Sequence, residues 1–165
     1  RDVAPSRGLG DVYKRQVVKP AADGLMELYL ESITAARESG DPAEATSQGN
    51  EGTELVLKYI YENFDVFKLI FCHSAGTEYE RYFDELAEIE EKYYREFVKQ
   101  FSRRENMVSD FFIHVICRTG WSYIYEVVSH DLSYDEAQIF MKSIREFCFA
   151  GWGKVLGQNY EDLGL

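Results

Sequence analysis

From Val17 onward, apolar residues recur every three or four positions, and this spacing restricts the fold more than any other feature of the sequence. It places apolar side chains along one face of an α-helix, whereas a half-buried β-strand needs strict alternation. No stretch alternates for long enough to form a strand. The sequence therefore predicts an all-α protein, a bundle of about six helices.

Capping residues mark the start of two of the expected helices. Asp41, Pro42 and Glu44 supply an N-cap, a proline at the first helical position and a capping-box acid. Ser133 and Glu136 form the same kind of signature before the last helix. We expect helices to begin at both places.

The middle of the chain predicts a short buried helix followed by a long amphipathic one. The segment VFKLIFCH after Asp65 is nearly all apolar and too short to be stable alone, so it must be buried. Thr77 with Glu80 repeats the capping signature, and we expect it to open a helix that runs to about Arg104. The solvated face of this long helix is expected to carry the carboxylates of Glu85, Glu88, Glu90 and Glu91.

The segment 110–130 is apolar on almost every side, which is typical of a central helix or an interface helix. A polar stripe nevertheless recurs at every fourth position, formed by Asp110, His114, Arg118, Ser122 and Glu126. Two interpretations of this stripe are open. It is either a narrow strip facing solvent or a set of polar groups lining a ligand cavity.

The cavity interpretation selects a set of ligand-binding residues. Aromatic residues make up 15% of the chain, and so many large rings are hard to close-pack without leaving gaps. Any single ring, taken alone, is explained by a place in the hydrophobic core. Ligand sites in helical bundles lie between helices and combine apolar walls with a few polar groups. A partly buried Arg118 needs an acidic partner or an anionic ligand. The candidate effector-binding residues are Phe67, Phe71, Tyr93, Phe97, His114, Cys117, Arg118, Trp121 and Tyr125.

The last two expected helices carry more apolar surface than one stripe, and glycines interrupt both of them. Small residues let helix axes approach closely, and pairing with a second copy is the usual way to cover such surface. A monomeric core can use the same glycines. We expect a homodimer whose interface includes Gly120, Tyr123, Phe147, Gly151, Trp152 and Val155.

Charge and cysteine usage exclude several classes of protein. The net charge of −11 disfavours contact with nucleic acid phosphates and with anionic membranes. No apolar run reaches the length of a transmembrane helix, and no signal-peptide segment is present. Cys72, Cys117 and Cys148 are odd in number and far apart, which favours reduced thiols in the cytoplasm.

Catalytic and metal-binding motifs are not found in the sequence. No nucleophile elbow, phosphate loop, dinucleotide fingerprint or zinc-protease helix is present. His114 and Cys117 share a helix face but have no third ligand at metal-site spacing, so we expect neither a metal nor a cofactor. An acid–base set of His114 with Glu126 or Asp110 remains a remote alternative to a non-enzyme.

The first sixteen residues differ in composition from the rest. They carry four basic and two acidic residues, against fourteen and twenty-seven in residues 17–165. The run shows no helical period and looks like translated adaptor sequence. We therefore expect residues 1–16 to be a non-native or disordered segment, and residues 17–165 to form one domain.

Three stretches resemble the C-terminal body of TetR/AcrR-type transcriptional regulators. They are KPAADGLMELYLESI at 19–33, YIYENFDVFKLIFCHSAGTEYERYFDEL at 59–86 and SHDLSYDEAQIFMKSIREFCFAGWGKVLG at 129–157. The resemblance implies an effector-binding domain whose last two helices form a four-helix bundle with a second subunit. It also implies DNA binding through an N-terminal helix-turn-helix unit that is absent from this sequence.

By this resemblance, a small hydrophobic or aromatic effector would bind in each subunit and change the spacing of two DNA-reading units. The alternative is a helical module that only dimerises, with its rings packed solid and no cavity. A cavity that reaches Arg118 would favour the first function, and a filled core around Trp121 would favour the second.

Overall fold

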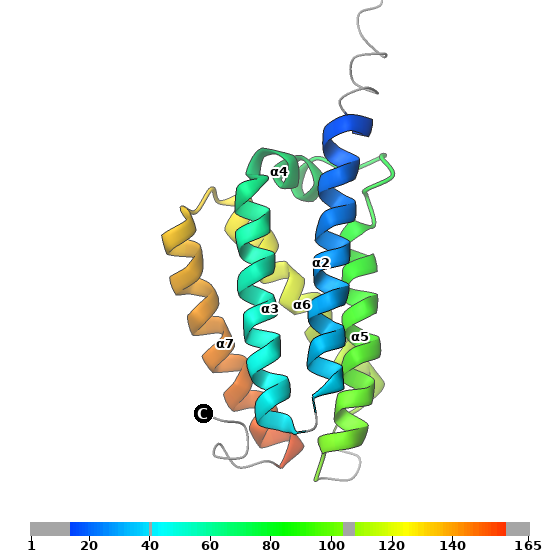
Figure 1. Ribbon diagram of the computed structural model, residues 1–165, viewed down its shortest axis with the longest axis vertical. Coiled ribbons are helices and arrows are strands. Elements are labelled where there is room, and N and C mark those ends of the chain that lie inside the picture. The colour runs from blue at the N-terminus through cyan, green and yellow to red at the C-terminus, as the bar shows by residue number, and fades with distance from the viewer. Residues whose placement is uncertain (1–13, 40, 104–107, 158–165) are drawn as a thin grey trace, which may run out of the picture.

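The computed structural model describes residues 14–39, 41–103 and 108–157, which form six α-helices preceded by one π-helical turn (Figure 1). The elements are η1 (Lys14–Val18), α2 (Lys19–Glu38), α3 (Pro42–Glu62), α4 (Phe64–Cys72), α5 (Tyr82–Phe101), α6 (Asp110–Ser129) and α7 (Tyr134–Leu156). None of the residues in these ranges is in a strand. The predicted all-α bundle of about six helices is confirmed. Most of the expected N-terminal segment, residues 1–13, lies outside the described residues.

The helices form a bundle that α4 closes at one end (Figure 1). Helices α2, α3, α5 and α7 run along the long axis, and α6 crosses behind them. The closest packing joins α2 to α3 and α5 to α6, while α4 packs on α6 and on the start of α2. Three helices, α4, α5 and α6, therefore meet at one end of the bundle.

The N-caps predicted at Asp41 and Ser133 both form, but the reciprocal capping box is present only at Ser133, and Glu44 makes no such return bond to Asp41. The Asp41 side chain accepts hydrogen bonds from the backbone N–H groups of Ala43 at 2.9 Å and Glu44 at 3.0 Å, and Pro42 is the first residue of α3. Before α7, the Ser133 N–H donates to the Glu136 carboxylate at 2.9 Å in a full capping box. These contacts satisfy N–H groups that have no partner within the first helical turn.

The long helix of the middle segment begins later than predicted, at Tyr82 rather than near Thr77. Gly76 has a positive φ of 74°, and its N–H donates to the Glu80 carboxylate at 3.2 Å. Glu80 therefore stabilises a run of turns instead of capping a helix. The helix ends at Phe101, before the expected Arg104, which lies outside the described residues.

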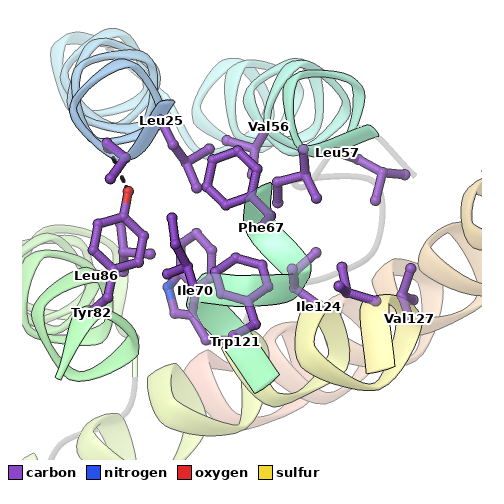
Figure 2. Packing of buried hydrophobic residues seen from close by; sticks show 14 of the residues in the cluster. Leu25, Val56, Leu57, Phe67, Ile70, Tyr82, Leu86, Trp121, Ile124 and Val127 are labelled. Atoms are coloured by element: carbon purple, nitrogen blue, oxygen red, sulfur yellow. Dashed lines mark hydrogen bonds between the residues drawn. The ribbon is translucent and has the colours of Figure 1, made fainter. Parts of the chain in front are cut away.

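The core is centred on α4, as the short apolar segment predicted. Phe67 is fully buried between Leu25 of α2 and Val56 of α3, and Trp121 of α6 points toward the same core (Figure 2). The hydroxyl of Tyr82 donates to the Ala22 carbonyl at 2.6 Å, which ties the start of α5 to α2 (Figure 2). Within the described residues, no helix is both long and apolar enough to cross a membrane.

Helix α6 is only half enclosed, although its sequence suggests burial all round. One face is buried through Ile113, Cys117, Trp121, Ile124, Val127 and Val128. The other face exposes Phe111 at 76% of its surface and Val115 at 42%. The neighbours of α6 within the chain cover one face of it, and a second apolar face remains uncovered.

Candidate functional site

A pocket of about 240 Å³ opens where α4, α5 and α6 meet, and we call it the α4–α5–α6 pocket. Its walls are mostly aromatic and its polar groups are few, a composition typical of small-molecule sites. It is lined by Phe71, Phe83, Asp84, Arg118, Trp121, Ser122 and Tyr125.

Buried rings form the base of this pocket and charged groups form part of its wall. Phe71 and Trp121 are 6% and 5% exposed, and the Phe71 ring lies 4.3 Å from the Phe83 ring. The Arg118 guanidinium forms an ion pair with Asp84, so the arginine has the acidic partner that its position requires. The pocket therefore offers an apolar base of mutually tilted rings beside a partly exposed charge pair.

Four of the nine predicted effector residues line the α4–α5–α6 pocket: Phe71, Arg118, Trp121 and Tyr125. The other five lie elsewhere. Phe67 has no exposed surface and fills the core, and Cys117 is also buried. Tyr93 and Phe97 belong to a series of ring contacts along α5, with 5.8 Å between their centroids. His114 lies further along α6, paired with Glu91.

The polar stripe of α6 faces α5 at the surface of the bundle. The Asp110 carboxylate lies 3.4 Å from Arg95, and His114 Nδ1 lies 2.8 Å from Glu91. Arg118 continues the series through Asp84. At the end of the stripe, Glu126 pairs with His130 at 3.1 Å. Most of the stripe thus joins two helices in partly exposed ion pairs, and only Arg118 and Ser122 reach the pocket.

The expectation that Glu90 and Glu91 lie on a solvated face is wrong. Glu91 is 6% exposed and is satisfied by Arg95 at 3.0 Å and His114 at 2.8 Å. Burial raises the pKa of Glu90 from 4.5 to about 8, and the nearby Tyr29 hydroxyl offsets only part of this rise. Arg95 and His114 pair with Glu91 and Asp110 rather than with Glu90, so the charged form of Glu90 is costly.

The position of Glu90 in the sequence is itself a signal of burial. Glu90 lies four residues after the fully buried Leu86 and four before Tyr94, so it falls in the apolar stripe of α5. Burial raises the pKa of Tyr94 well above its ordinary value, and the nearby Glu90 carboxylate adds to the rise. An acid at a core-facing helical position indicated a buried carboxyl group.

The predicted dimer residues fall into two groups. Phe147 is 72% exposed and Gly151 is also exposed on α7, so both are available to a second chain. Gly120 instead faces α5: a Cβ atom there would lie 3.7 Å from a Glu90 carboxylate oxygen. Placing Gly120 in a dimer interface is therefore not supported, because its missing side chain makes room for a carboxyl group of the same chain.

Of the other predicted dimer residues, Trp152 packs within the chain. Its ring stacks on Tyr94 with a centroid distance of 4.8 Å and an interplanar angle of 3°, and it meets Phe112 edge-on at 5.6 Å. The Tyr123 ring lies 6.3 Å from Phe140 and is partly buried, as is Val155.

A second pocket, of about 270 Å³, lies between α3 and α7. Its wall includes Arg145, whose guanidinium contacts Glu54 at 3.2 Å, and the exposed side chains of Ile139 and Lys142. Although slightly larger, it lacks a buried aromatic base and does not contact α4. We therefore take the α4–α5–α6 pocket as the better candidate for a ligand site.

Comparison with known proteins finds no relative: no family model matches the sequence, and no curated protein or solved structure is significantly similar to it. Among the described residues, no group of three or more His, Cys, Asp or Glu side chains is arranged to hold a metal ion. The three cysteines are free thiols.

Proposed function

We propose that this chain is the effector-sensing and dimerisation body of a TetR-like bacterial transcriptional regulator acting in the cytoplasm. A small hydrophobic or aromatic ligand would bind in the α4–α5–α6 pocket and alter DNA binding by a helix-turn-helix unit joined ahead of α2. The observation that carries the proposal is the pocket itself, with its buried aromatic base at Trp121 and its charge pair at Arg118.

The size of the pocket favours a compact ligand. Its volume of about 240 Å³ lies just under the range of roughly 300–1,000 Å³ typical of ligand sites. One or two aromatic rings would fill it. The exposed part of the Arg118–Asp84 pair would bind a polar substituent by exchanging one partner for the ligand.

Helix α4 supplies a physical connection between the pocket and the start of α2. Phe71 near the end of α4 lines the pocket, and the same helix packs against η1 and α2. Val18, at the junction of η1 and α2, is buried in the core. A ligand that shifts α4 would therefore bias the direction in which α2 leaves the bundle, which is the coupling that a sensor requires.

The test is a thermal-shift screen of one- and two-ring aromatic compounds with the Trp152→Phe variant, whose only tryptophan is Trp121. A ligand present at 100 times its Kd stabilises the native state by about 2.7 kcal/mol. We expect a hit to raise Tm by roughly 5–10 °C and to change Trp121 fluorescence.

Matched variants on α6 locate the binding site. Tyr125→Ala removes a wall of the pocket, whereas Phe111→Ala removes an exposed ring from the same helix outside the pocket. We expect only Tyr125→Ala to weaken the hit. If both variants bind equally well, or if no compound binds, the pocket is not an effector site.

The second candidate function is a module that only dimerises, and the exposed apolar side chains of α7 favour it. Phe147 and Ile139 of α7 are 72% and 69% exposed. Such exposed large apolar side chains on one helix are unusual on the surface of a monomer. A concentration-dependent dimer with no aromatic ligand would support this function in place of sensing.

A further inference from the structure

The ion pair in the wall of the α4–α5–α6 pocket is not symmetrical. Both oxygens of the Asp84 carboxylate have a guanidinium partner, because Arg118 bonds Oδ1 and Arg81 Nε lies 3.5 Å from Oδ2. Arg118 bonds Asp84 through one of its nitrogens, Nη1. A guanidinium group has five N–H donors, and one carboxylate oxygen takes up only part of this capacity. The pair therefore offers a ligand N–H donors rather than an unpaired oxygen.

The donors of Arg118 are accessible and lie beside the rings of the pocket. The Arg118 side chain is 42% exposed and lines the pocket, whereas that of Asp84 is 33% exposed. Arg118, Trp121 and Tyr125 are three and four residues apart on α6, so they lie on one face of this helix. A ligand group bound to the guanidinium is therefore next to the aromatic base.

A ligand can join the ion pair by replacing either of its members, and the two replacements differ in cost. A carboxylate that takes the place of Asp84 on Arg118 leaves Asp84 with Arg81. A cation that takes the place of Arg118 would lie close to Arg81, and like charges at such short range repel each other. It would also leave the partly buried Arg118 without its carboxylate. The arrangement thus favours an anion.

The acidity of the whole chain does not oppose an anion at this place. The net charge is −11, but charges more than about 8 Å apart are largely screened at physiological ionic strength. Near the pocket the charges balance, because Arg81 and Arg118 are matched by Asp84 and by Glu88, which lies 3.5 Å from Arg81. Ring faces attract cations, but a charge-assisted pair of hydrogen bonds to a guanidinium is the stronger interaction.

We infer that the α4–α5–α6 pocket binds an aromatic carboxylic acid as its anion, with the carboxylate on Arg118 and the ring against the aromatic base. This inference rests on the proposed function and deepens it, because it names the chemical class of the effector. The base suits a flat ring: Phe83 is tilted by 32° to Phe71 and by 57° to Trp121. A ring that enters between them would meet an edge of one and a face of another, a favoured geometry.

The experiment compares three ligands of nearly the same planar shape and different charge: 2-naphthoate, 2-naphthamide and 2-naphthamidine. The one-ring series of benzoate, benzamide and benzamidine covers a smaller volume. Binding to the full chain is measured by isothermal titration calorimetry at neutral pH and physiological ionic strength. In at least one series we expect the carboxylate to bind about tenfold more tightly than the amide, and the amidine no more tightly than the amide.

Three variants test whether the ion pair sets this preference. Arg118→Gln should remove the preference for the carboxylate over the amide, whereas Arg118→Lys should keep part of it, because Lys retains the charge but not the planar fork. Asp84→Asn removes the competing carboxylate, so it should strengthen binding of the carboxylate ligand severalfold. Both side chains are partly exposed, and urea unfolding confirms that each variant is folded.

A second ion pair supplies matched controls. Arg37 of α2 and Glu96 of α5 lie 4.0 Å apart, with side chains 54% and 59% exposed, and neither lines the pocket. Arg37→Gln and Glu96→Gln change the net charge by the same amounts as the variants of Arg118 and Asp84. We expect both controls to bind all the ligands like the original chain, which separates a direct contact from a change in overall charge.

The outcomes separate this inference from the proposed function. If the amide or the amidine binds as tightly as the carboxylate, or if Arg118→Gln keeps the preference, the inference is overturned. It is also overturned if no member of either series binds. The proposed sensor still stands in these cases if the aromatic screen gives a hit that Tyr125→Ala weakens. If the screen gives no hit either, the proposed function itself has failed.

Discussion

Replacing Glu90 by Gln should stabilise the protein in neutral and alkaline solution. The two side chains have nearly the same shape, but Gln cannot carry a charge. The reason is linkage between folding and protonation. Burial raises the folded-state pKa of this carboxyl group from 4.5 to about 8, so between these values the folded state binds a proton that the unfolded state has lost.

The sign and size of the effect follow from that difference. Stability falls as pH rises through this window, by about 1.4 kcal/mol per pH unit. Above pH 8 the full cost of the buried charge is present, at most about 5 kcal/mol, and water that reaches the remaining surface of the side chain reduces it. Gln cannot ionise, so it avoids this cost.

Urea unfolding followed by far-UV circular dichroism, at half-unit steps from pH 5 to 8.5, measures the effect. We expect Glu90→Gln to flatten the pH profile and to raise the free energy of unfolding at pH 8.5 by several kcal/mol. Glu88→Gln, exposed on the same helix, should leave the profile unchanged in shape. Parallel profiles for the original chain and Glu90→Gln would refute a buried, uncompensated carboxyl group.

Two further changes test the packing of the bundle and its exposed face. Gly52→Ala should destabilise the protein by about 1–3 kcal/mol, because the new Cβ would lie 2.6 Å from Ser32 Cβ where α2 meets α3. Gly49→Ala, on the same helix with open space around it, should instead stabilise by up to about 1 kcal/mol. Equal effects in chemical denaturation would contradict this close approach. The double change Phe147→Ser and Ile139→Ser should shift sedimentation toward monomer with Tm nearly unchanged, and an unaltered dimer would place the interface elsewhere.

Local sequence determined the helices, because hydrogen bonds and caps within a helix involve residues only a few positions apart. The apolar spacing predicted the all-α class, and the signatures at Asp41 and Ser133 predicted two helix starts correctly. The same signature at Thr77 predicted a helix start that was wrong. The Glu80 carboxylate accepts a hydrogen bond from the Gly76 N–H in a turn, and the helix begins only at Tyr82, which packs on α2. Whether a capping pair opens a helix depends on the contacts that the following residues make.

Only the tertiary structure decided which residues share a site. Phe71, Arg118, Trp121 and Tyr125 were predicted as ligand residues and line one pocket, but Asp84 and Phe83 complete it from another helix.

The crossing of α5 and α6 likewise places Gly120 against Glu90. The sequence alone had suggested a dimer interface for Gly120 and a solvated face for Glu90. A sequence period fixes the face of a helix on which a residue lies. It does not fix which helix covers that face, and that choice sets the burial, partners and charge state of a side chain.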